Sequence, residues 1–283
     1  MHSELPSLEP TRAEVIGTGF DVVAWRVPDP TGDWTLRVPR HARAIEVVEA
    51  QSALMRHLKQ HVIPVPREAR VLGDGADRCG LYRFVAGRHA LVEDGAAEER
   101  LASQLAEILD RLHRLPTDEL PARLVRPIED RFGPIIERCL PHLDGARRAW
   151  LGAVEARLER LSAEPPPFVL VHADLKPEHV ILGEDGTIEA LLDFEGIQVS
   201  DPAIDFSRII QHWGRPLAER VLGGYAGAVD ARFLERAQLY CDLDGVELLH
   251  TVIEDGAEEW RETALREIDE ATLRSVDALN PPA

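Results

Sequence analysis

Apolar and polar residues alternate along the first third of the chain, as they do in half-buried β-strands. Segments 22–27 and 34–38 are rich in β-branched and aromatic residues, and the turn-forming stretch PDPTGD at 28–33 separates them, so we expect a hairpin. In its second strand Thr35 and Arg37 share one face, and the other face carries Trp34, Leu36 and Val38.

Apolar residues at helical spacing predict a helix over 44–61, and two further strands are expected at 69–72 and 80–85. After residue 87 apolar residues recur every three or four positions, which predicts amphipathic helices. We expect these helices at 97–115, 145–162, 203–213, 217–229 and, in pieces, 231–279. Three short strands interrupt the helices, and we expect them at 168–172, 179–183 and 188–194. The turn residues EDG at 184–186 join the last two strands into a hairpin.

The charge along the chain changes with this pattern. Residues 1–86 hold 11 basic and 11 acidic residues, so residues 87–283 carry the whole net charge of −18. A neutral, strand-rich front and an acidic, mostly helical back predict an α+β protein with two lobes, residues 1–86 and residues 87–283.

The composition excludes several classes of protein. Hydrophobic residues make up 45% of the chain and charged residues 29%, which are values of a globular protein. The negative charge disfavours nucleic acid and anionic membranes as partners and favours cationic small molecules. We expect no signal peptide and no membrane-spanning segment, because no basic stretch precedes an apolar run near residue 1 and no apolar run is long enough to span a bilayer. The three cysteines lack metal or disulfide spacing, so we predict a cytoplasmic protein with free thiols.

Residues able to do chemistry gather around the three short strands. Asp174 follows the first of them, His179 begins the second and Asp193 ends the third. A hairpin between the second and third strands would bring His179 close to Asp193. We therefore expect three oxygen and nitrogen ligands to converge on one cleft, on loops held by a rigid sheet.

This segment resembles the catalytic loop and the metal-binding loop of the aminoglycoside phosphotransferase family. The enzymes of that family are relatives of the protein kinases. The family pattern is His-x-Asp-x-x-x-x-Asn, then a metal-binding Asp in a short apolar strand, then Asp-Pro-x-x-Asp. The chain offers His172-Ala-Asp174-Leu-Lys-Pro-Glu-His179, then Leu-Asp193-Phe, then Asp201-Pro-Ala-Ile-Asp205. The resemblance implies a two-lobed, protein-kinase-like fold.

The same resemblance assigns a role to each residue of the motif. It implies that Asp174 is the catalytic carboxylate, which orients the acceptor hydroxyl and accepts its proton, and that Asp193 holds Mg²⁺ against the phosphates of a nucleotide. His172 and Asp205 would brace the loop. The alternative is that these are ordinary solvated loop residues.

His179 stands where the family pattern has Asn, and the resemblance makes it a metal ligand. An imidazole nitrogen is a softer ligand than an amide oxygen, and it cannot ligate when protonated. In having His at this position, the chain resembles two branches of the family, the macrolide phosphotransferases and the 2″-type aminoglycoside phosphotransferases. That similarity implies GTP as the phosphate donor, with ATP as the alternative.

Two segments of the front lobe resemble the same branches, namely GTGFDVVAW at 17–25 and LRVPRHARA at 36–44. The second implies that Arg37 grips the phosphates, with Glu49 as its first expected partner and Glu46 as its second. The hinge that would bind the purine through its backbone consists of Tyr82, Arg83, Phe84 and Val85. The plainer interpretations are a surface arginine and an ordinary edge strand.

Recognition of the acceptor is expected in the acidic helical region 230–262, with Asp242, Glu247 and Glu254 as candidates, although such acids are often a solvated helix face. The predicted function is transfer of the γ-phosphate of GTP or ATP to a hydroxyl of a cationic antibiotic, such as a macrolide or an aminoglycoside, which would confer resistance. A sugar or amino-alcohol kinase of the same fold and a nucleotide-binding pseudoenzyme remain as alternatives.

Overall fold

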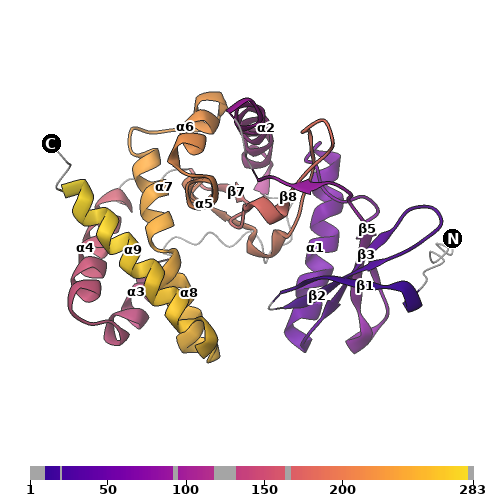
Figure 1. Ribbon diagram of the computed structural model, residues 1–283, viewed down its shortest axis with the longest axis horizontal. Helices are drawn as coiled ribbons and strands as arrows, with labels where there is room; N and C mark the ends of the chain where they lie inside the picture. Colours follow the sequence, from indigo (N-terminus) through magenta and orange to yellow (C-terminus); the bar gives the residue numbers. More distant parts are fainter. Residues whose placement is uncertain (1–9, 20, 92–94, 118–131, 163–166, 280–283) are drawn as a thin grey trace. The chain divides into compact units, whose positions relative to one another are not determined.

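The structure is a computed structural model that describes residues 10–19, 21–91, 95–117, 132–162 and 167–279 (Figure 1). Its elements confirm the predicted mixture of antiparallel strands and helices. The chain forms two compact units, divided as Met1–Val125, Asp174–Ile197 and Glu219–Ala226 in the first, and Arg126–Ala173, Gln198–Ala218 and Gly227–Ala283 in the second. The lobe boundary expected after residue 86 stays a prediction.

The first unit contains a five-stranded antiparallel sheet in the order β1-β2-β3-β5-β4. Its strands are β1 (Glu14–Thr18), β2 (Val22–Val27), β3 (Trp34–Pro39), β4 (Arg70–Leu72) and β5 (Cys79–Arg83). The expected hairpin is present, because β2 pairs with β3 across PDPTGD. Arg37 lies opposite Ala24 on one neighbouring strand and opposite Gly80 on the other, so it occupies the interior of the sheet.

Helix α1 (Ala42–Gln60) lies beside this sheet (Figure 1) and buries Val48, Leu54 and Leu58. The helix approaches β5 at Gly80, where an added Cβ would lie 2.9 Å from a methyl group of Val48. A glycine at this position therefore lets the helix sit close to the strand.

A second, three-stranded sheet of the first unit has the order β6-β8-β9, formed by β6 (Arg88–His89), β8 (Val180–Leu182) and β9 (Ile188–Leu191). Helix α2 (Gly95–His113) buries every apolar position that its spacing predicted, Leu101, Leu105, Ile108, Leu109 and Leu112. Its Gln104 donates to the carbonyl of Gly186 (3.0 Å) and accepts from the N–H of Ile188 (2.7 Å). The helix thereby anchors the turn of the β8–β9 hairpin.

The second unit is mostly helical and contains one strand pair, β7 (Val169–Val171) with β10 (Gln198–Ser200). Its helices are α3 (Gly133–Cys139), α4 (Gly145–Ser162), α5 (Ala203–Trp213), α7 (Phe233–Asp242), α8 (Asp244–Asp255) and α9 (Arg261–Leu279). Helix α6 (Arg215–Gly224) contributes to both units. Ile136, Leu151, Leu249 and Ile268 share the apolar core of this unit. No helix within the described ranges is long and apolar enough to cross a membrane.

Helices α8 and α9 run side by side (Figure 1), and they pack tightly at Gly245. A Cβ at Gly245 would lie 2.8 Å from the Cβ of Glu267 and 2.9 Å from the carbonyl oxygen of Ala264. Because one of these contacts is backbone, the neighbouring helix would have to move to accept a methyl group.

We expect Gly245→Ala to lower the free energy of unfolding by about 1–3 kcal/mol through overpacking. Gly152→Ala is the matched control, because Gly152 lies inside α4 with nothing within 4 Å of an added Cβ. There alanine should raise the stability by up to about 1 kcal/mol through helix propensity. Urea unfolding of both variants measures the difference, and equal effects would contradict the close packing of α8 on α9.

Candidate active site

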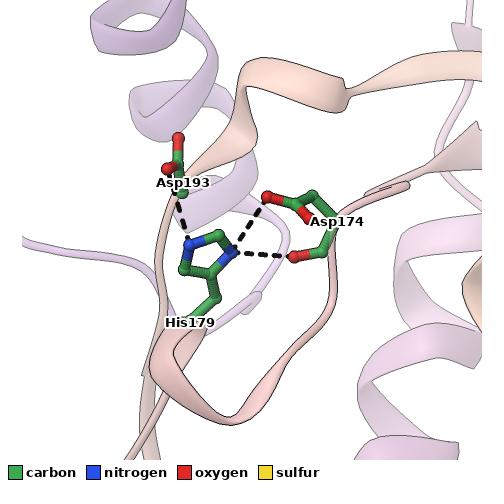
Figure 2. A group of neighbouring side chains, drawn as sticks. All are labelled: Asp174, His179 and Asp193. Carbon is green, nitrogen blue, oxygen red and sulfur yellow. Dashed lines mark hydrogen bonds and ion pairs between the residues drawn. The ribbon is translucent and has the colours of Figure 1, made fainter. Parts of the chain in front are cut away.

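His179 lies between two carboxylates, and its ring orientation is set by the backbone (Figure 2). Its Nδ1 is 2.8 Å from the carbonyl oxygen of Asp174 and 3.3 Å from Oδ2 of the same residue. A carbonyl oxygen can only accept a hydrogen bond, so we assign the ring proton to Nδ1. In the neutral ring the lone pair is therefore on Nε2.

That Nε2 faces Asp193, with 3.5 Å between it and Oδ2 (Figure 2). The hairpin creates this proximity, because the N–H of Leu192 donates to the carbonyl of His179 at 2.8 Å. Two lone pairs that face each other attract only when a proton or a cation lies between them. The arrangement therefore points to positive charge at this position.

Asp174, His179 and Asp193 together satisfy the geometry of a metal site, as each offers one ligand atom and these atoms lie within 4.8 Å of one another. Two carboxylates are the hard ligands that Mg²⁺ prefers, and imidazole is acceptable to Mn²⁺ and other divalent ions. A metal-ligating histidine commonly donates its second N–H to a carbonyl, as His179 does. This donor set fits a divalent cation.

Two cationic side chains lie next to these acids. The Nη2 atom of Arg37 is 3.5 Å from Oδ1 of Asp193, and Nζ of Lys176 is 3.3 Å from Oδ2 of Asp174. Arg37 is only 6% exposed, so its charge acts with little screening by water. Carboxylates, a divalent-cation site and two cations in one place can hold a polyphosphate. Lys176 was not among the residues predicted for the site, although it is one of only two lysines in the chain.

A cavity of about 580 Å³ extends from these charged groups and lies wholly within the first unit. Its lining includes Gly17 and Gly19 of the predicted glycine-containing loop, and an apolar part formed by Val22, Ala24, Ile181 and Leu192. The alternation of strand 22–27 could have indicated Val22 and Ala24, because they share one face. A cleft of this size, with both apolar and charged residues in its lining, suits a nucleotide.

Three of the four residues of the expected hinge face the cavity. Tyr82, Phe84 and Val85 line the cavity, but Arg83 does not. The guanidinium of Arg83 stacks over Trp34 at 3.9 Å from the ring centroid. The N–H groups of Arg83 and Phe84 already donate to backbone carbonyls, at 2.9 Å each. In the described part of the chain the N–H of Val85 has no backbone acceptor, so it is the hinge donor available to a ligand.

The expected Arg37–Glu49 ion pair is not formed. The Glu49 carboxylate accepts a hydrogen bond from Arg78 at 2.6 Å instead, and both side chains are about 40% exposed. Arg78, which precedes β5, reaches Glu49 on α1, whereas Arg37 lines the cavity. Glu46, the second expected partner, is exposed one turn earlier in the helix.

Asp205 holds the backbone that precedes Asp174. It is fully buried and accepts the N–H groups of His172 (3.0 Å) and Ala173 (2.7 Å). Ala173 has a φ of 64°, a left-handed conformation that costs a residue with a Cβ roughly 1–2 kcal/mol. The two hydrogen bonds that the buried carboxylate accepts offset that cost. His172 is also fully buried, as expected of a residue that supports the loop.

The three acids expected to bind the acceptor all lie in the second unit, and each forms an ion pair with an arginine. Asp242 pairs with Arg274 at 3.1 Å and Glu254 pairs with Arg138 at 2.6 Å. Glu247 pairs with Arg208 at 3.1 Å. A ligand amine that binds these acids would have to displace the arginines or share the acids with them. The role of the acids in binding the acceptor stays a prediction.

Burial raises the pKa of Asp242 above its ordinary value of 3.8, because desolvation outweighs the attraction of Arg274. The folded protein therefore favours the protonated carboxyl, and this contribution to stability is lost as the pH rises through the folded-state pKa. We expect Asp242→Asn to leave the melting temperature at pH 7 unchanged or to raise it. As the pH falls, the stability of the wild type should rise relative to that of the variant.

Asp269→Asn is the control with the opposite sign, since a hydrogen bond from Arg147 lowers the pKa of Asp269. That variant should lose stability at pH 7, and the loss should shrink as the pH falls. Thermal unfolding between pH 7 and pH 4 checks both variants. A marked loss of stability for Asp242→Asn at pH 7 would contradict the dominance of desolvation.

Comparison with known proteins gives three findings. A model of the phosphotransferase enzyme family matches residues 12–240. The uncharacterized protein YcbJ of Bacillus subtilis strain 168 is 25% identical over 238 residues, which cover 75% of this chain and 74% of YcbJ. The fold is similar to the GDP complex of aminoglycoside 2'-phosphotransferase-IIIa, with a TM-score of 0.83 and 21% identity over 95% of this chain and 94% of that one. It is also similar to the apoenzyme of macrolide 2'-phosphotransferase MphH from Brachybacterium faecium, with a TM-score of 0.74 and 20% identity over 98% and 95%.

Proposed function

The chain belongs to the phosphotransferase enzyme family, and we propose that it transfers the γ-phosphate of GTP or ATP to a hydroxyl group of a cationic small molecule. One observation carries this proposal: Asp174, His179 and Asp193 converge beside Arg37, and the last two of them line a nucleotide-sized cavity together with Arg37. The two structural neighbours are an aminoglycoside 2'-phosphotransferase and a macrolide 2'-phosphotransferase, which supports an antibiotic as the acceptor.

The cavity offers a distinct place to each part of a nucleotide. The Val85 N–H, next to Tyr82 and Phe84, would bind the base, and the apolar lining would cover the ribose and the purine face. Arg37 and Lys176 would bind the phosphate oxygens. Asp193 and His179 would hold Mg²⁺, which neutralises charge on the transferring phosphoryl group.

The proposed chemistry uses Asp174 as the base. An acceptor hydroxyl oxygen attacks the γ-phosphorus, while the bond from that phosphorus to the β–γ bridging oxygen breaks. The hydroxyl proton passes to the carboxylate of Asp174, which is about one-third exposed and so can be reached by an acceptor. The products are a phosphate ester and a nucleoside diphosphate. Arg37 is fixed in a central strand and needs no reorganisation to oppose the developing charge.

The ion pairs of the second unit favour a second candidate acceptor class. Asp242, Glu247 and Glu254 each share their charge with an arginine, so fewer free acids remain for a polyamine. Acceptors with one amine or none, such as a macrolide, a sugar or an amino alcohol, need fewer such acids. The ion pairs therefore favour a macrolide kinase or a kinase of a small metabolite over a kinase of polyamine aminoglycosides.

Incubation of the purified protein with Mg²⁺ and GTP or ATP, against a panel of aminoglycosides, macrolides, sugars and amino alcohols, tests the proposal. We expect nucleoside diphosphate release that depends on one acceptor class, with a mass gain of one phosphate on that acceptor. Bound nucleotide without turnover on any acceptor would favour the pseudoenzyme.

We expect Asp174→Asn to lower kcat by about 10²–10⁴-fold, because the amide cannot accept the hydroxyl proton. The Kd for GDP should stay close to that of the wild type. Asp185→Asn is the control, as Asp185 is an exposed acid in the β8–β9 turn and should retain full activity. Near-normal turnover in Asp174→Asn would contradict the assigned role.

A further inference from the structure

Arg208, in α5, was not part of the predicted site, yet its guanidinium joins three separate segments of the second unit. Its Nε donates to the carbonyl of Ala173 at 3.0 Å. Its Nη1 donates to Asp244 and to Gln211, and its Nη2 donates to Glu247 at 3.1 Å. The side chain is only 14% exposed, so these interactions are largely shielded from water.

The contact with Ala173 falls on the peptide bond that precedes Asp174. The carbonyl group of Ala173 and the Cα atom of Asp174 belong to one planar peptide unit. A group that holds this carbonyl therefore restricts the direction in which the Asp174 side chain leaves the backbone. Asp205 already holds the preceding peptide through the N–H of Ala173, so Arg208 and Asp205 together fix both sides of this left-handed residue.

The other contacts of Arg208 fall on the beginning of α8. Asp244 and Glu247 are three residues apart in the first turn of that helix, so both carboxylates face the same arginine. Gln211, one turn after Arg208 in α5, also donates to Asp244, at 2.5 Å. In the same turn of α8, Gly245 packs closely against α9. The first turn of α8 thus determines where the side chain of Arg208 lies.

We propose that Arg208 is a positioning residue for phosphoryl transfer, which makes the peptide in front of Asp174 depend on the first turn of α8. The inference rests on the proposed function of Asp174. It gives the acidic Glu247 a role different from the predicted one: the carboxylate holds the arginine that holds the catalytic loop. A change that moves the start of α8 would alter the orientation of Asp174 without any contact with the nucleotide.

Hydrogen–deuterium exchange of the full-length protein, followed by mass spectrometry, tests the holding contacts directly. In Arg208→Gln we expect amides of residues 172–176 and of the first turn of α8 to exchange about tenfold faster than in the wild type. Arg147→Gln is the matched control, since Arg147 makes two hydrogen bonds to Asp269 (2.7 and 2.8 Å) in the same unit and none to the catalytic loop. The control should leave exchange at 172–176 unchanged.

Steady-state kinetics then separates positioning from simple stability. With the acceptor found in the panel, kcat of Arg208→Gln should fall by about 100-fold through misorientation of the base, while KM for the nucleotide and Kd for GDP stay within about twofold. Arg208→Lys retains a charge that can reach one partner at a time, so its kcat should lie between that of the wild type and that of Arg208→Gln. Asp244→Asn combined with Glu247→Gln should lower kcat in the same direction although Arg208 is intact.

Three results would overturn the inference. Unchanged exchange at 172–176 in both Arg208 variants would show that the peptide does not depend on this side chain. Faster exchange with a kcat like that of Arg147→Gln would show that the contact has no catalytic consequence. If the wild type transfers phosphate to no acceptor, the proposed function itself fails and the positioning role fails with it, an outcome distinct from the first two.

Discussion

The pairing of β8 with β9 is the constraint on which the candidate site depends. His179 lies immediately before β8 and Asp193 two residues after the end of β9, and the hydrogen bond from Leu192 to the His179 carbonyl places them side by side. Helix α2 secures the far end of the hairpin through Gln104. Asp193 itself has a left-handed backbone, with a φ of 58°, which an Asp tolerates better than most residues with a Cβ. The geometry of the ligands is thus built into the sheet and not left to flexible side chains.

Electrostatics supports the proposal that a polyphosphate binds at this place in the first unit. The chain has a net charge of −18, and many of its arginines form ion pairs with surface acids. Arg37 and Lys176 are different because they neighbour Asp193 and Asp174, the acids that we assign to the reaction. The charges of these two acids and two cations cancel, so a divalent cation bound by the acids would make the local balance positive. Repulsion between the protein and a nucleotide would then be replaced by attraction at one point.

Local patterns were enough to predict most of the elements and the convergence of Asp174, His179 and Asp193. Strand 22–27 and the buried face of α2 follow directly from apolar periodicity, and the hairpin turn follows from its Gly and Asp residues. Strands β1, β6 and β10 were not indicated, because each is short or exposed and is defined by its pairing partner more than by its own residues. The roles of Glu49 and Arg208 could not be derived for a related reason. The reach of a long side chain depends on which segments are neighbours in space, and Arg78 and Ala173 are distant in sequence from the residues they contact.

The most direct test of the account is a pulsed electron paramagnetic resonance measurement of the wild-type protein with Mn²⁺ and GDP. We expect the spectrum to show coupling of the metal to phosphorus and to a directly bonded imidazole nitrogen. The nitrogen coupling should disappear in His179→Asn, whose amide oxygen can still ligate the ion. A Mn²⁺–GDP complex of the wild type with phosphorus coupling but no nitrogen coupling would contradict the claim that His179 and Asp193 hold one cation against the nucleotide.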